Sequence, residues 1–254
     1  MELLTLVIVL TVFLCVFTLE VIAPASKNHC DRRWMILASA ISLFQSAITI
    51  GAGLVFVETF KNISMFGFSD LNVVIQGCLG FVLTSFVAYW WHRAMHKYDL
   101  LWRLFHQLHH SPRRIEALTS FYLHPFDGIA ATFLNALCCY VVLGLSAYGT
   151  AISLIIAALY NIYIHADLKT PHWLGFIIQR PEMHRVHHKY MHHAQNYGLA
   201  IWDQLFGTFS NPKEYVQEVG FDKVREAQIY DMLKNKDVYK TKNVSLSCDS
   251  IPRR

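Results

Sequence analysis

Long apolar stretches alternate with short polar segments along the first two thirds of this chain. Three stretches are long enough to cross a bilayer as a single helix: Leu3–Ile22, Trp34–Val57 and Leu71–Trp91. A fourth stretch, 126–164, carries a single charged residue, Asp127, and a turn-like sequence at 144–149, so it predicts a helical hairpin of two spans. The pattern therefore predicts an all-α membrane protein with about four to five transmembrane helices.

Composition supports this class of protein. Hydrophobic residues make up 54% of the 254 residues and charged residues only 16%, and the mean hydropathy is +0.31. These values are too apolar for a soluble domain of this length. The first stretch lacks a basic n-region, and its apolar length exceeds the h-region of a signal peptide, so we expect a retained anchor.

Basic residues are placed asymmetrically around the spans. One group lies between the first two spans and a larger group follows the third: Lys27, Arg32 and Arg33, then Arg93, Lys97, Arg103, Arg113 and Arg114. The positive-inside rule puts the amino terminus outside and these segments in the cytoplasm, together with the polar tail 211–254. The net charge of +4 is explained by this asymmetry, so nucleic acid is not an expected partner.

Histidines are the main candidates for a functional site in this sequence. All but one of the fourteen lie between His92 and His193, and most fall into one HxxxH and two HxxHH groups. The groups are His92-Arg-Ala-Met-His96, His106-Gln-Leu-His109-His110 and His184-Arg-Val-His187-His188. Helical residues three or four apart share a face, and neutral imidazole suits zinc, copper, iron or nickel. Eight such residues exceed the four to six positions of one ion, so we expect a histidine-rich helical cap that holds two metals.

The groups lie where spans meet the cytoplasm. His92 and His96 follow an aromatic belt at 89–91 that marks the membrane interface. The stretch 100–110 predicts a helix lying in that interface, which Ser111-Pro112 ends. His165 closes the hairpin, with Asn161 on the same helical face. Metals held there would lie at the hydrocarbon boundary, so the expected substrate is a lipid.

The motifs in this order, followed by the sequence Asn196-Tyr-Gly-Leu-Ala-Ile-Trp-Asp203-Gln-Leu-Phe-Gly-Thr208, resemble the fatty acid hydroxylase and sterol desaturase superfamily of integral membrane non-haem di-iron oxygenases. The resemblance covers roughly residues 70 to 210. It implies a catalytic domain at 71–210, preceded by anchor helices at 1–70 and followed by a polar cytoplasmic tail at 211–254.

The resemblance also implies the reaction. Members use dioxygen and two electrons to hydroxylate or desaturate a lipid, so a monooxygenase or desaturase with two iron ions is expected, although a purified sample can carry zinc. The implied ligands are His92, His96, His106, His109, His110, His165, His184, His187 and His188. Some relatives carry histidine where this chain has Asn161, so Asn161 joins the expected metal site as a weak or water-mediated ligand. A separate electron donor of the cytochrome b5, ferredoxin or reductase type is implied, because none is fused to the chain.

Carboxylates are also expected beside the ligands. Hydrogen-bond acceptors are needed to orient ligand imidazoles, and the candidates are Asp99, Asp167 and Asp203, with a structural role favoured for the first two. Glu182 is expected to be a charge in the first turn of a helix. The histidines excluded from the ligand list are His29, His124, His172, His192 and His193; His124 before Pro125 is equally well explained as a helix cap.

Two other function classes stay open from the residues. A zinc-dependent membrane hydrolase would need a glutamate between two histidine ligands, as in HExxH, and none is present. A haem-binding electron carrier would need histidines paired inside the spans, whereas these lie at their ends. The lipid itself (sterol, fatty acyl chain, sphingoid base, alkylglycerol or fatty aldehyde) and the choice between hydroxylation and desaturation are not fixed by the sequence.

Overall fold

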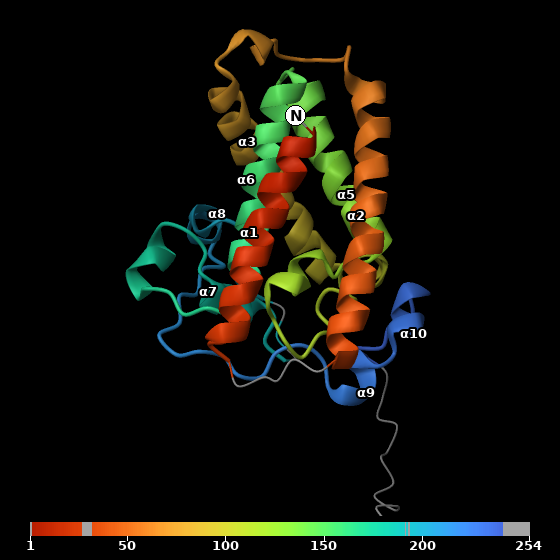
Figure 1. The fold of residues 1–254 in the computed structure, drawn as a ribbon, viewed down its shortest axis with the longest axis vertical. Helices are drawn as coiled ribbons and strands as arrows, with labels where there is room; N and C mark the ends of the chain where they lie inside the picture. Colours follow the sequence, from red (N-terminus) through yellow and green to blue (C-terminus); the bar gives the residue numbers. More distant parts are fainter. Residues whose placement is uncertain (1, 27–31, 191, 193, 241–254) are drawn as a thin grey trace, which may run out of the picture.

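The computed structural model describes residues 2–26, 32–190, 192 and 194–240, and shows a bundle of long helices that stands on a layer of short ones (Figure 1). Four helical segments are long and apolar enough to cross a membrane: α2 (Arg32–Phe60), α3 (Val73–Lys97), α5 (Pro125–Ala136) with its π-helical extension η4 (Leu137–Val142), and α6 (Ala147–His165). The helix α1 (Glu2–Ile22) lies beside them. No strand occurs among the described residues, so the all-α prediction with four to five spans is confirmed.

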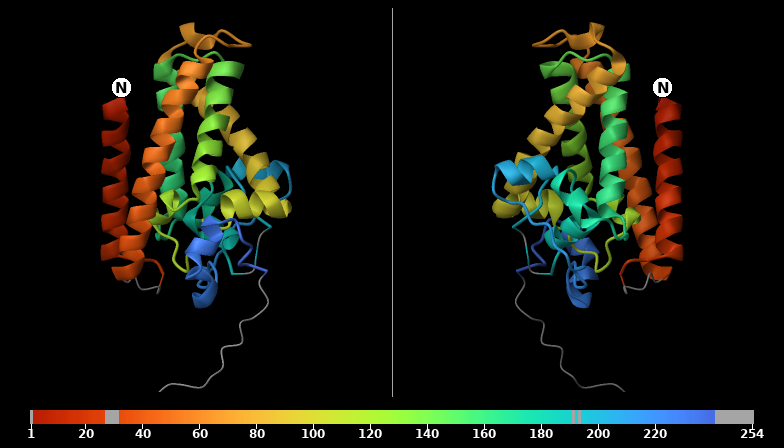
Figure 2. Two further views of the ribbon diagram at one scale, coloured as in Figure 1. Left: turned by 90° about the vertical axis from the view of Figure 1, so that its right-hand side faces the viewer. Right: turned by 90° about the vertical axis from the view of Figure 1, so that its left-hand side faces the viewer.

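The helices α3 and α6 form the centre of the bundle, while α1 packs on α6 and α2 packs on α5. Figure 2 shows α1 and α2 together on one side of the molecule. Small residues bring α3 and α6 close together. A Cβ atom at Gly77 of α3 would overlap Ile152, and one at Gly149 of α6 would overlap Gln76. Such close approach is typical of helix pairs inside a membrane.

The turn of the hairpin is shorter than the sequence indicates. It covers residues 143–146, whereas 144–149 was the expected turn, because α6 begins at Ala147. The Ser146 side chain accepts a hydrogen bond from the Gly149 amide at 3.1 Å and so caps α6. Gly144 has a φ of +64°, which a glycine adopts without strain. The sequence therefore located the hairpin correctly but missed the serine cap.

The segment 100–110 is not the continuous interfacial helix that the sequence predicted. One short turn, α4 (Asp99–Leu101), leads into the π-helix η2 (Trp102–His106), and residues 107–110 form a turn. The amide of Gln107 bonds to the carbonyl of Trp102 at 2.8 Å, five residues back. The Gln107 side chain is held by the Lys236 carbonyl and the Val238 amide, so contacts distant in sequence stabilise this wide turn.

Short helices complete the layer below the bundle: η3 (Ala117–Phe121), η5 (His172–Phe176), α7 (Pro181–His187), α8 (Ala200–Leu205), α9 (Lys223–Glu226) and α10 (Ile229–Leu233). The described part of the C-terminal segment covers this layer. Phe221, Met232 and Val238 are buried in one hydrophobic cluster with Trp102 and Leu108. The division of the chain into three domains stays a prediction, but residues 219–239 share a core with the histidine layer.

A buried carboxylate fastens α1 to this layer. Glu20 accepts hydrogen bonds from the backbone amides of Ala117 (2.9 and 3.1 Å) and Asp167 (2.6 Å). Glu20→Ala leaves both amides buried without this partner, so we expect a loss of about 2–4 kcal/mol in the free energy of unfolding. Thermal unfolding in detergent micelles measures this loss as a lower Tm.

Glu58→Ala is the matched control, because Glu58 lies on the exposed end of α2 and, among the described residues, pairs only with exposed Lys61. It should leave the Tm unchanged. An equal fall in Tm for both variants would show that Glu20 does not fasten α1.

Candidate metal centre

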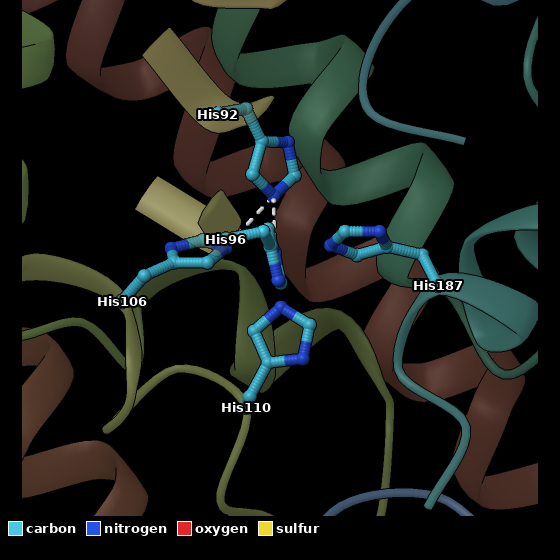
Figure 3. Close-up of side chains that lie close together, drawn as sticks. All are labelled: His92, His96, His106, His110 and His187. Atoms are coloured by element: carbon cyan, nitrogen blue, oxygen red, sulfur yellow. Dashed lines mark hydrogen bonds between the residues drawn. The ribbon is translucent and has the colours of Figure 1, made fainter. Parts of the chain in front are cut away.

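Nine histidines converge in the layer below α3 and α6. They form two groups, and within each group one ring nitrogen of every residue lies within 4.8 Å of the others. The first group is His92, His96, His106, His110 and His187; the second is His109, His165, His184 and His188. Figure 3 shows the first group, whose rings point from four sides toward a common centre. Each group could hold a metal ion, so the histidines converge as the prediction of a metal site requires.

The sequence motifs divide between the groups in a regular way. Residues four apart stay together: His92 with His96, His106 with His110, and His184 with His188. The remaining histidine of each HxxHH motif, His109 or His187, joins the other group. Adjacent positions of a helix, such as i+3 and i+4, point roughly a quarter of a turn apart, so neighbouring histidines can face different centres. Each HxxHH motif therefore contributes to both groups.

Hydrogen bonds fix which ring nitrogen faces the first centre. Nδ1 of His92 donates to the Tyr197 carbonyl at 2.7 Å, and Nδ1 of His106 donates to the Asp127 carboxylate at 3.1 Å. A neutral imidazole carries only one hydrogen, so each Nε2 presents a lone pair. The two Nε2 atoms lie 2.8 Å apart. Two lone pairs at this distance repel each other unless a cation binds them, so the donor set fits a metal ion.

The second group repeats the arrangement. Nδ1 of His165 donates to the Asn161 carbonyl at 2.8 Å. Nε2 of His165 then lies 3.1 Å from Nε2 of His109 and 3.0 Å from Nε2 of His184. The imidazoles converge with their metal-binding nitrogens, as in the first group. In both groups, an oxygen atom of the protein accepts the Nδ1 hydrogen of an imidazole and so turns the Nε2 atom toward the centre.

Burial keeps these imidazoles neutral. It lowers the pKa of His106 to about 3. It also lowers the pKa of His109, His110, His184 and His188 well below the usual value, helped by the neighbouring imidazoles. Protons therefore do not compete for the lone pairs near neutral pH.

Two pairs of stacked imidazole rings join the two groups. His110 of the first group stacks on His188 of the second, with ring centroids 4.1 Å apart. His187 and His184 stack in the same manner at 5.3 Å. Ions bound in the two groups would be immediate neighbours, because each HxxHH motif supplies donors to both groups.

Asp127 is the carboxylate that orients the imidazole of His106, and it was not among the carboxylates predicted for this role. It lies buried in the first turn of α5 and accepts the hydrogen bond from His106. A signal for it existed in the sequence, because Asp127 is the only charged residue of the stretch 126–164. An ionisable residue in an otherwise apolar span is a functional candidate by default.

The three predicted carboxylates have other partners. Asp203 accepts bonds from the amides of Tyr197 and Gly198 and from Thr208, and so holds the loop whose carbonyl orients His92. Burial raises the pKa of Asp203 to about 6. Asp99 pairs with surface cations, and Asp167 bonds to Ser26 and Tyr215, as the favoured structural role implies.

The excluded histidines that the structure describes, His124, His172 and His192, lie outside both groups. Nδ1 of His124 accepts from the Phe126 amide at 3.2 Å, with Pro125 at the first helical position, so His124 is the N-cap of α5. His172 bonds to the Asn211 carbonyl, and His192 bonds to Gln195. His29 and His193 lie outside the described residues. Glu182 lies in the first turn of α7 and pairs with Arg180 and Thr170.

Asn161 contributes to the second group through its backbone. Its carbonyl orients His165, while its side-chain amide donates to the Ser120 carbonyl at 2.9 Å. Coordination of a metal by the Asn161 side chain stays a prediction.

Comparison with known proteins agrees with this site. Residues 77–208, slightly more than half of the chain, match the family model described as fatty acid hydroxylase. An ornithine lipid hydroxylase of Rhizobium tropici is 34% identical over 147 residues, which are 55% of this chain and 43% of that protein. A sphingolipid C4-hydroxylase of Schizosaccharomyces pombe is 26% identical over 153 residues (58% and 51%). Human lathosterol oxidase is 29% identical over 154 residues (59% and 49%).

The aligned part thus spans about half of each of these relatives or less, and no solved structure matches the chain. The matched residues 77–208 contain all nine converging histidines and Asp127. On the family match, this chain belongs to the fatty acid hydroxylase family.

Proposed function

We propose that the protein is a membrane di-iron oxygenase that hydroxylates or desaturates a lipid, with dioxygen as oxidant and electrons from a separate donor protein. The observation that carries this proposal is the pair of adjacent, buried histidine groups, in which neutral imidazoles converge on two centres. The nine histidines are the proposed ligands, five for one ion and four for the other.

Two iron ions bound here would supply the oxidising centre that activates dioxygen for attack on a C–H bond. An imidazole donor set of this kind suits iron, although it also binds zinc. Neither group includes an aspartate, glutamate or cysteine among the described residues. The donors are therefore uncharged, which leaves bound ions strongly electrophilic.

The surrounding residues hold the imidazoles rather than react. Asp127 fixes the tautomer of His106, the Tyr197 carbonyl fixes that of His92, and the Asn161 carbonyl fixes that of His165. Such partners raise the basicity of a ligand and prevent its ring from turning. Seven of the nine histidines are buried, and His92 and His96 are partly buried, which limits the access of bulk water to both centres.

A lipid is the substrate class that this position favours. His92 and His96 end the span α3, and His165 ends the span α6, so the centres lie at the end of the apolar bundle. The relatives named above are, by their names, an ornithine lipid hydroxylase, a sphingolipid hydroxylase and a sterol oxidase. Their common feature is a largely hydrocarbon substrate, which can reach this level from within the bilayer.

Lipid profiling tests the proposal. Cells that express the chain, grown under ¹⁸O₂, should contain a lipid that has gained one labelled oxygen or lost two hydrogens. Cells that express the His188→Ala variant should lack it. A product that forms equally well without dioxygen would instead support the zinc hydrolase.

The histidine layer is proposed to face the cytoplasm, as the basic residues indicate. Cys30 and Cys248, which lie outside the described residues, should then be protected from an impermeant thiol reagent in intact cells and react after permeabilisation, because reagent access limits labelling. Labelling of Cys248 in intact cells would place the layer on the other side of the membrane.

A further inference from the structure

The elements η5 and α8 expose bulky apolar side chains on the outside of the histidine layer. The residues Trp173, Phe176, Ile177, Ile201, Leu205 and Phe206 form this surface, which we call the apolar collar. Ile177 is 70% exposed and Leu205 is 65% exposed. In Figure 1 the collar lies at the left of the layer, where η5 is the outermost teal turn and α8 lies above α7. An apolar surface of this extent marks an interaction site on most proteins.

The collar adjoins the lipid-facing side of a membrane span. Phe206 packs on Trp90 of α3 with ring centroids 4.8 Å apart, and Trp202 of α8 packs on Phe86 at 5.2 Å. The Trp202 indole also donates to the Ser85 hydroxyl at 3.0 Å. These α3 residues lie in the second half of the helix, from its middle residue onward, so α8 lies beside the span and not below it. Figure 2 shows α8 beside the lower half of α3.

Within the collar, η5 is held against α8. The Gln204 side chain of α8 donates to the Phe176 carbonyl of η5 at 3.1 Å, and Phe176 packs on Phe209 at 5.9 Å. The Gln204 amide nitrogen also bonds to the Ala200 carbonyl, so it is satisfied within the protein. The collar therefore forms one continuous surface that runs from Trp90 outward.

A cation marks the level of the lipid headgroups next to the collar. The Arg93 guanidinium lies over the Trp90 ring, 5.1 Å from its centroid, one turn before the end of α3. Arginine and tryptophan together are typical of the boundary between hydrocarbon and water. Trp90 contacts both the collar and Arg93, so the collar lies at the same boundary.

From these contacts we infer that the apolar collar is a second membrane contact, in which η5 and α8 insert into the interface of the leaflet next to the histidine layer. The bilayer is the occupant because the collar continues the exposed face of a span that lipid already covers. The contact is independent of the reaction that the metal centres perform. It holds the layer at a fixed depth, with His92 only two residues beyond Trp90.

Site-directed spin labelling measures this depth. Leu205→Cys and Ile177→Cys are made in a full-length chain whose native cysteines are replaced by alanine, and each variant is labelled and placed in phosphatidylcholine vesicles. Accessibility to oxygen, which concentrates in hydrocarbon, is compared with accessibility to chromium oxalate, which stays in water. Both sites should give an oxygen-to-chromium ratio several times that of Tyr230→Cys.

Tyr230 is the matched control, since it is 67% exposed on α10, a short helix of the layer below the bundle that is not among the candidate spans. Val82→Cys on the exposed face of α3 gives the ratio of a lipid-facing site. Chromium accessibility at Ile177 and Leu205 equal to that at Tyr230 would overturn the inference. Shielding of both sites from both reagents would overturn it as well, because a second protein would then cover the collar.

A second measurement avoids the cysteine-free background. In the otherwise native chain, brominated phosphatidylcholine should quench part of the tryptophan fluorescence, and Trp173→Phe should reduce the quenched part. Loss of only unquenched fluorescence in this variant would place η5 in water and contradict the inference.

Discussion

Replacement of His110 or His188 by alanine is expected to abolish lipid oxidation and to release metal. The two residues belong to different groups but stack on each other. Each variant therefore removes a donor from one centre and a ring that packs against a donor of the other. An ion that loses one of its four or five imidazole ligands is no longer held in its full coordination geometry. We expect activity at background, and bound metal reduced from about two ions per chain to about one or fewer. Elemental analysis of the purified variants measures the second effect independently of turnover.

His172→Ala is the control for this experiment. His172 lies in η5, bonds to the Asn211 carbonyl and belongs to neither group. Its removal should leave metal content and turnover near those of the unmodified chain. Full turnover in the His110→Ala protein would contradict the assignment of two centres.

Replacement of Asp127 should weaken metal binding without removal of a ligand. Asp127→Ala frees His106 to rotate and to change its tautomer, and loss of such a partner typically lowers metal affinity by about 10–100-fold. Asp127→Asn keeps an acceptor for the His106 proton but removes the charge, so its effect should be smaller. Competition with a chelator in detergent solution measures the metal Kd of both variants.

Asp99→Ala provides the comparison, because Asp99 is a partly exposed aspartate that pairs with Arg103 and Lys240. Its metal Kd should be unchanged. If Asp127→Ala and Asp99→Ala bound metal equally well, the role of Asp127 in the centre would be refuted.

The spans and the histidine pairs were predictable because they depend on local rules. A stretch of apolar residues long enough to cross the bilayer has few other stable structures. Likewise, His92 and His96 share a face on any helix, so their convergence needs no knowledge of the rest of the fold. Both features are present in the structure as expected.

The remaining features depend on contacts between distant segments. The division of the HxxHH motifs requires that α7 lie against the turn 107–110, which the sequence does not encode locally. The π-helical turn before His106 is stabilised by Gln107 and residues more than a hundred positions away. Asp127 acquires its role only because the start of α5 packs next to η2, which brings its carboxylate to His106.

The packing of the C-terminal tail, too, was not predictable from the sequence. Its composition is polar, so the sequence predicted a cytoplasmic segment outside the catalytic part of the chain. Phe221, Met232 and Val238 are nonetheless buried against Trp102, which in turn packs on His96 and His110. A few apolar side chains spaced along a polar segment do not produce a periodic signal, and only the tertiary structure shows where they pack.

Iron reconstitution tests the central claim most directly. The purified chain is loaded anaerobically with ferrous iron in vesicles made from the lipids of its host, bound iron is counted, and one turnover is started with ¹⁸O₂ and a chemical reductant. We expect about two iron ions per chain, five and four imidazoles being available to them. We also expect one ¹⁸O atom in a product lipid, or the loss of two hydrogens from it. A product that forms without dioxygen, or with zinc in place of iron, would contradict the account.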